Sequence, residues 1–137
     1  MLLNDFFSIL RIERNNEVTL SSEIYTVLCR INSNHRIFEG HFPENPVVPG
    51  VCLVEMIKEC IEEIKHQKLF LTESSNIKFL NMVNPIMIPE LMFEINFLTS
   101  INNNYKIKTM VKANDSVFLK FEGIFEIIKS TGKNYVS

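Results

Sequence analysis

A segment at positions 39–50, EGHFPENPVVPG, limits the fold of this chain more than any other part of the sequence. Its twelve residues hold three of the five prolines and two of the four glycines. Proline has no backbone N–H and disfavours helical conformation in the residue before it, so neither a helix nor a central strand can run through the segment. The sequence therefore predicts a rigid, irregular loop between two regions of regular structure.

Two stretches outside this loop have helical patterns. In residues 50–67, Leu53, Ile57 and Ile61 recur on one face at about 100° per residue, which predicts one long helix. Residues 2–10 also place apolar side chains at helical spacing, and they predict a short amphipathic helix.

The remaining regular stretches predict strands. Residues 23–31 alternate between the two sides of a strand. Further strand-like runs, which polar turns separate and which can pair as an antiparallel meander, lie at residues 76–80, 91–99, 105–112 and 117–128. The last run is apolar on both faces in places, and a sheet face that one helix cannot cover indicates a second subunit. One long helix against a mostly antiparallel sheet is an α+β fold.

Composition and charge argue against several classes of function. With 137 residues and no linker or repeat, the chain is expected to form one domain over residues 1–137. A net charge of −2 offers no basic field for nucleic acid. No apolar run is long enough for a membrane span, and the first residues lack the charge order of a secretory signal. Three cysteines at irregular spacing predict reduced thiols and a cytoplasmic location.

The sequence has no motif for nucleotide or metal chemistry. Glycine-rich phosphate loops, a nucleophile elbow and an HExxH helix are all absent. The histidines and cysteines do not pair at ligand spacing except across loops, so no metal site is expected.

Candidate chemistry remains in the loop and at the start of the helix that follows it. His41 lies in backbone that three prolines stiffen, which can aim an imidazole, although a histidine in such a place is often only a packed or surface residue. Gly50 has no side chain, so a carbonyl oxygen can approach its amide at the positive end of the helix dipole. The simpler alternative is that Gly50 only begins the helix.

Glu55, in the second turn of the helix, also has two interpretations. It is a solvated charge like Glu59, Glu62 and Glu63, or it lines a second apolar surface beside Val51. In the second case burial would raise the pKa of Glu55 and would let the carboxyl act as an acid near neutral pH.

The segment GHFPENPVVPGVCLVE, at residues 40–55, resembles the GHFPxxPxxPGVxxxE signature of the 3-hydroxyacyl-ACP dehydratases of the FabZ and FabA type. The fourteen positions from His41 to Glu55 are the spacing of that family. A later Lys-Phe pair at 78–79, followed by two prolines, also resembles the family. The resemblance covers most of the chain and implies the hotdog fold, in which a sheet wraps around a long central helix.

The resemblance also implies a reaction and a site. His41 would remove the α-proton of a (3R)-3-hydroxyacyl-ACP thioester, or of its acyl-CoA counterpart. Glu55 of the partner subunit, in a homodimer or a higher assembly of dimers, would help the hydroxyl leave as water. The backbone amide of Gly50 would bind the thioester carbonyl, and Phe42 and Val51 would contact the substrate. The product would be the trans-2-enoyl-ACP of fatty-acid or related lipid or polyene synthesis. The family needs no metal or organic cofactor.

Departures from the family pattern leave two alternatives open. Glu44 stands where the family usually has glycine, and Glu59 stands where it usually has glutamine. These changes suit a non-catalytic, acyl-ACP-binding hotdog subunit of a heterodimer. An acyl thioesterase is the other alternative, although hotdog thioesterases lack the HFPxxPxxPG loop.

Overall fold

A computed structural model gives the structure of residues 1–15, 23–40 and 44–129. Its elements are β1 (Phe7–Arg14), β2 (Glu23–Ile31), a 3-10 helix η1 (Arg36–Phe38), α1 (Gly50–Lys65), β3 (Leu69–Phe79), β4 (Glu90–Ile101), β5 (Asn104–Ala113) and β6 (Ser116–Ile127).

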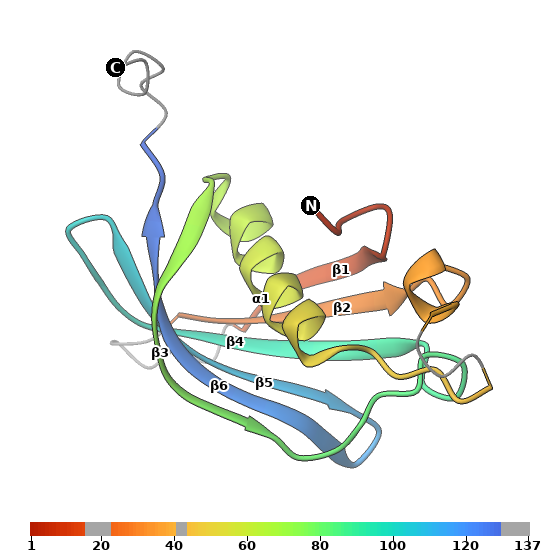
Figure 1. Ribbon diagram of the computed structural model, residues 1–137. Helices are drawn as coiled ribbons and strands as arrows, with labels where there is room; N and C mark the ends of the chain where they lie inside the picture. Colours follow the sequence, from red (N-terminus) through yellow and green to blue (C-terminus); the bar gives the residue numbers. More distant parts are fainter. Residues whose placement is uncertain (16–22, 41–43, 130–137) are drawn as a thin grey trace.

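The six strands form one curved sheet that wraps around α1 (Figure 1). Their order is β1-β2-β4-β5-β6-β3, and each neighbouring pair of strands is antiparallel. The predicted α+β fold, with one long helix against an antiparallel sheet, is confirmed. Because β3 joins the sheet beside β6, only β4, β5 and β6 form the expected meander, and β1 and β3 are the two edges.

The predicted helix at residues 2–10 is wrong. Asn4 has a φ of 68°, and the chain turns there before β1 begins at Phe7. Phe6 and Phe7 are both buried, and strand β1 bulges between Ile9 and Arg11. The helical spacing of the apolar residues therefore arises from a turn followed by a bulged strand.

The predicted long helix and first strand are confirmed. Strand β2 has the predicted bounds, and α1 begins at Gly50. The helix stops at Lys65 because His66 adopts a left-handed conformation with a φ of 54°. Strand β3 begins at Leu69, seven residues before the predicted start at residue 76, and most of this added part is polar and exposed.

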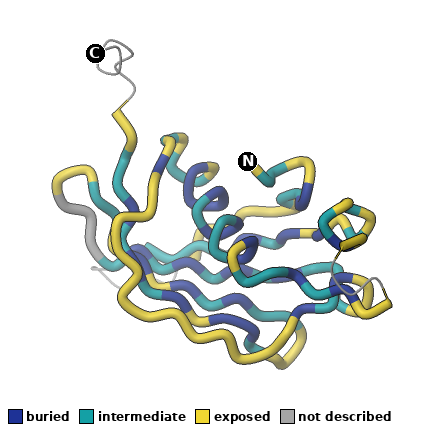
Figure 2. Tube along the Cα trace, in the orientation of Figure 1, coloured by how far each residue is buried: buried dark blue, intermediate teal, exposed yellow. Residues whose placement is uncertain are grey.

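The apolar core lies between α1 and the concave face of the sheet. Phe121 and Phe125 of β6 are buried there. The opposite face of β6 carries Lys120, Glu122 and Glu126, so the expected second apolar face is largely polar. Most of the exposed large apolar side chains of the described residues instead lie on β3 and on the segment that follows it, which Figure 2 shows as a long exposed stretch: Phe70, Leu71, Ile77, Phe79, Leu80, Met82, Ile86 and Met87.

Cys29, Cys52 and Cys60 are free and buried, in agreement with the prediction of reduced thiols. The sulfur atoms of Cys29 and Cys60 are 3.7 Å apart. Within the described residues, no helix is both long and apolar enough to cross a membrane.

Candidate active site

The start of α1 presents backbone amides at the positive end of the helix dipole. Pro49 is the N-cap and makes no side-chain capping bond, and the amides of Cys52 and Leu53 both donate to its carbonyl oxygen. An α-helix leaves its first amides without an intrahelical acceptor. Those of Gly50 and Val51 are therefore placed to bind a partly negative oxygen.

Gly50 is packed against the last residue of β3. A Cβ atom built on Gly50 would lie 2.7 Å from two carbons of the Phe79 ring. With Phe79 in this position only glycine fits, because real Cβ atoms essentially never approach that closely. The contact brings the end of β3 to the start of the helix.

An apolar groove runs between α1 and β3. Its volume is about 340 Å³, in the range of small-molecule sites. The residues that line it are Gly50, Val51, Val54, Glu55, Lys58, Leu71, Ile77, Phe79 and Phe125. Only the Glu55 and Lys58 side chains among them are charged, so the groove suits an apolar ligand that meets one carboxyl.

Glu55 is partly buried in this groove. Its side chain is 36% exposed, and one of its oxygens lies 3.3 Å from the Lys58 ammonium. Burial raises the pKa of Glu55, and a hydrogen bond with Glu59 raises it further, whereas Lys58 opposes the rise. Glu55 therefore keeps its proton to a higher pH than an ordinary glutamate does.

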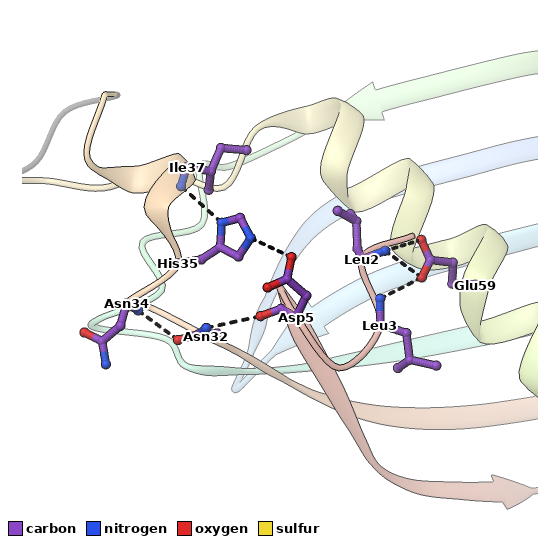
Figure 3. A network of polar contacts seen from close by, with 8 residues as sticks. All are labelled: Leu2, Leu3, Asp5, Asn32, Asn34, His35, Ile37 and Glu59. Atoms are coloured by element: carbon purple, nitrogen blue, oxygen red, sulfur yellow. Dashed lines mark hydrogen bonds and ion pairs between the residues drawn. The ribbon is translucent and has the colours of Figure 1, made fainter.

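The other carboxylates of α1 do not share one environment. Glu59 and Glu62 are only 1% and 7% exposed. Glu59 accepts hydrogen bonds from the amides of Leu2 and Leu3 (Figure 3), and Glu62 accepts one of 2.8 Å from the amide of Leu69. The expectation of solvated charges is therefore wrong for both and holds only for the exposed Glu63.

The chain that leads into the proline-rich loop is anchored by His35. One ring nitrogen lies 3.1 Å from Asp5, and the other accepts a hydrogen bond from the amide of Ile37 at the start of η1 (Figure 3). Phe38, at the end of η1, is buried against Phe6 with ring centroids 5.6 Å apart. These contacts fix the backbone just before Gly40.

Of the five predicted site residues, Gly50, Val51 and Glu55 all line the groove. His41 and Phe42 lie outside the described residues. Sequence reasoning missed the β3 wall of the groove. The available signal was the alternation of Leu69 with Leu71 and of Ile77 with Phe79, which the polar residues 72–76 interrupt.

Comparison with known proteins agrees with this architecture. The sequence model of the ApeI-like family, described as ApeI dehydratase, matches residues 16–118. The 3-hydroxyacyl-[acyl-carrier-protein] dehydratase FabZ of Caulobacter vibrioides is 25% identical over 136 residues, which cover 93% of this chain and 84% of the relative.

Solved structures agree at the level of the fold. A putative thioesterase from Lactococcus lactis aligns with a TM-score of 0.62 and 11% identity, over 91% of this chain and 96% of its own. The dehydratase heterocomplex ApeI:P from Xenorhabdus doucetiae aligns with a TM-score of 0.56 and 12% identity, over 88% of this chain and 96% of that chain.

The antiparallel sheet wrapped around one long helix is the hotdog fold. The relatives and the signature loop place the chain within the hotdog dehydratases of the 3-hydroxyacyl-ACP type. The match over residues 16–118 shows that the chain belongs to the ApeI-like dehydratase family.

Proposed function

We propose that this protein dehydrates a (3R)-3-hydroxyacyl-ACP thioester to the trans-2-enoyl-ACP, as a homodimer in which each active site uses both subunits. The observation that carries the proposal is the position of Glu55. This carboxyl, whose pKa is raised chiefly by burial, lines an apolar groove that begins at the amides of Gly50 and Val51.

The mechanism is an elimination that uses three groups of the protein. His41 of one subunit removes the α-proton while the amide of Gly50, which lines the same groove as Glu55 on the partner subunit, donates a hydrogen bond to the thioester oxygen, where negative charge develops. The bond from C3 to the hydroxyl oxygen then breaks, and Glu55 of the partner subunit gives its proton to the departing oxygen, which leaves as water. Phe42 and Val51 contact the acyl thioester beside these groups.

Strand β3 is the edge at which we place the second subunit. It has eleven residues, and four of its apolar side chains are exposed. A long, exposed, apolar edge strand readily pairs with another chain. Edge strand β1 is shorter, with eight residues, and the charges of Arg11, Glu13 and Arg14 protect it. A second copy on β3 would also cover the open groove beside Glu55.

The cellular setting is part of the same proposal. The FabZ relatives are named for acyl-carrier-protein substrates, so fatty-acid synthesis, or a related lipid or polyene synthesis, is the pathway class that we infer. The buried free cysteines suit a cytoplasmic protein in which residues 1–137 form one hotdog domain.

The test is a direct assay of dehydration. Purified protein is mixed with 3-hydroxyacyl-ACP of several chain lengths, and the conjugated enoyl thioester is followed by its ultraviolet absorbance. We expect turnover by the wild type and a loss of about 10²–10⁴-fold in His41→Ala, the usual contribution of a general base. Equal turnover by the two proteins would contradict the mechanism.

A non-catalytic subunit of a heterodimer is the second candidate. Two observations favour it: Glu44 and Glu59 depart from the signature of the FabZ type, and a structural neighbour is a dehydratase heterocomplex. In that case the wild-type protein would bind acyl-ACP without turnover on any chain length. Release of a free thiol in place of enoyl thioester would instead identify a thioesterase.

A further inference from the structure

Glu59 is a buried carboxylate that the proposed mechanism does not use. It lies one helical turn after Glu55 and is 1% exposed. One oxygen accepts hydrogen bonds of 2.9 and 2.7 Å from the amides of Leu2 and Leu3, and the other lies 2.9 Å from the amide of Leu2 (Figure 3). Amide donors favour the ionised form of a buried carboxyl, so Glu59 is held as a carboxylate.

Glu55 and Glu59 lie one helical turn apart on α1 and line the same pocket. Residues four apart share one face of a helix, which brings the two side chains together. Two ionised carboxyls side by side repel each other, which favours a proton on one of the two groups. The amides of Leu2 and Leu3 favour the ionised form of Glu59, so the proton belongs on Glu55, although the Lys58 ammonium 3.3 Å from Glu55 acts in the opposite direction.

Glu55 stands between two environments. On one side it lines the apolar groove with Val51 and Phe79. On the other it lines a second pocket of about 290 Å³ together with Lys58 and Glu59. The proton that it shares with Glu59 is therefore carried by the carboxyl that faces the proposed acyl site.

We propose that Glu59 is a positioning residue, which keeps a transferable proton on Glu55 for delivery to the departing hydroxyl. The inference rests on the proposed function and adds a role for a residue that replaces the usual glutamine of FabZ-type enzymes. Glu59 does not touch the substrate and acts only through Glu55.

The pKa shifts of the Glu55 and Glu59 carboxyl groups agree with this arrangement. Burial and the hydrogen bond with Glu59 raise the pKa of Glu55. Burial alone would raise the pKa of Glu59 as well, but the hydrogen bonds from Glu55 and from the two amides outweigh it and lower that pKa. The other titratable groups that face the pair among the described residues are Cys52, Lys58, Cys60, Glu62, Lys68 and the amino group of Met1.

The proposed role of Glu59 predicts how kcat depends on pH. A general acid works while it is protonated, so activity falls as the pH rises through the pKa of Glu55. In Glu59→Gln the glutamine oxygen can still accept from the amides of Leu2 and Leu3, while its NH₂ group can donate to Glu55 and favour the ionised form. The alkaline fall of kcat should then begin at lower pH. At pH values above both the wild-type and the variant pKa, kcat of the variant should be about tenfold lower than that of the wild type for each unit by which the pKa of Glu55 falls.

The experiment has two readouts, each on the wild-type protein and on Glu59→Gln. The pH profile of kcat for the 3-hydroxyacyl thioester should shift its alkaline limb to lower pH with little change in KM. A carbon-13 NMR titration of the glutamate side chains, assigned with Glu55→Gln, should show Glu55 ionising at lower pH in the variant. The NMR readout needs no turnover, so an inactive wild type would contradict the proposed function while the titration still decides the carboxyl pair.

Glu62→Gln is the matched control. It also removes a buried carboxylate of α1 that accepts from a backbone amide. We expect it to lower the temperature of unfolding and to move the alkaline limb and the Glu55 titration much less than Glu59→Gln does, because Glu62 shares the pocket but lies two turns from Glu55. An unchanged Glu55 titration in Glu59→Gln, or the same shift of the pH profile in Glu62→Gln, would overturn the role of Glu59.

Discussion

Replacement of Glu55 by glutamine should lower kcat for dehydration by about 10²–10⁴-fold, the usual contribution of a general acid. Glutamine keeps the size of the side chain and its place in the groove, but it has no acidic proton to give to the departing hydroxyl. The measurement is the rate of enoyl thioester formation by ultraviolet absorbance. Glu63→Gln, on the exposed side of the same helix, is the matched control and should keep full activity.

The stability of Glu55→Gln separates this effect from misfolding. Because the folded state raises the pKa of Glu55, chiefly by burial, it binds the proton more tightly than the unfolded chain does. The wild type therefore loses stability as the pH rises from the unfolded pKa to the folded one. Glutamine removes this loss. Above that pH range the unfolding temperature of the variant should therefore be no lower than that of the wild type. Activity near the wild-type level in Glu55→Gln would contradict the assignment of Glu55 as the acid.

A lysine at position 77 should convert the dimer to a monomer and abolish most of the activity. Ile77 is 37% exposed on edge strand β3 and lines the groove beside Glu55. In a two-fold symmetric dimer, each subunit would bury one new ammonium group at the interface without a counter-ion. Each 1.4 kcal/mol of this desolvation cost weakens dimerisation about tenfold. The mass in solution, measured by light scattering at micromolar concentration, should fall from two chains to one.

Ile12→Lys is the control for this prediction. Ile12 is 39% exposed on β1, the other edge of the sheet, so it tests a similar change away from the proposed interface. Its mass and activity should remain those of the wild type. A monomeric wild type, or an Ile77→Lys variant that stays dimeric and active, would contradict an interface on β3.

The elements that could be predicted from the sequence are those with a complete local pattern. Strand β2 alternates over its whole length, and α1 keeps one apolar face from Leu53 to Ile61. The prediction of a helix at the first residues was wrong because Phe6 and Phe7 are buried by a turn and a bulged strand, in which apolar residues recur at the spacing of a helix. Periodicity describes one regular element and cannot detect a change of backbone conformation within the pattern.

The site was predictable to the extent that a motif carries it. The start of α1 follows from the proline-rich loop, and the spacing from Gly50 to Glu55 follows from the helix. The burial and hydrogen bonding of Glu59 could not be predicted, because its amide donors, Leu2 and Leu3, are more than fifty positions away in the sequence. Strand β3 was only partly predicted because much of it is polar and exposed, and residues 72–76 interrupt its alternation.

The most direct test of a site shared between subunits is complementation between two inactive variants. His41→Ala and Glu55→Gln chains, each with a different affinity tag, are expressed together, and the mixed dimer is purified through both tags. One of its two sites then combines an intact His41 with an intact Glu55 of the other chain, so we predict about half of the wild-type activity. A purified mixed dimer as inactive as either parent would contradict the shared site.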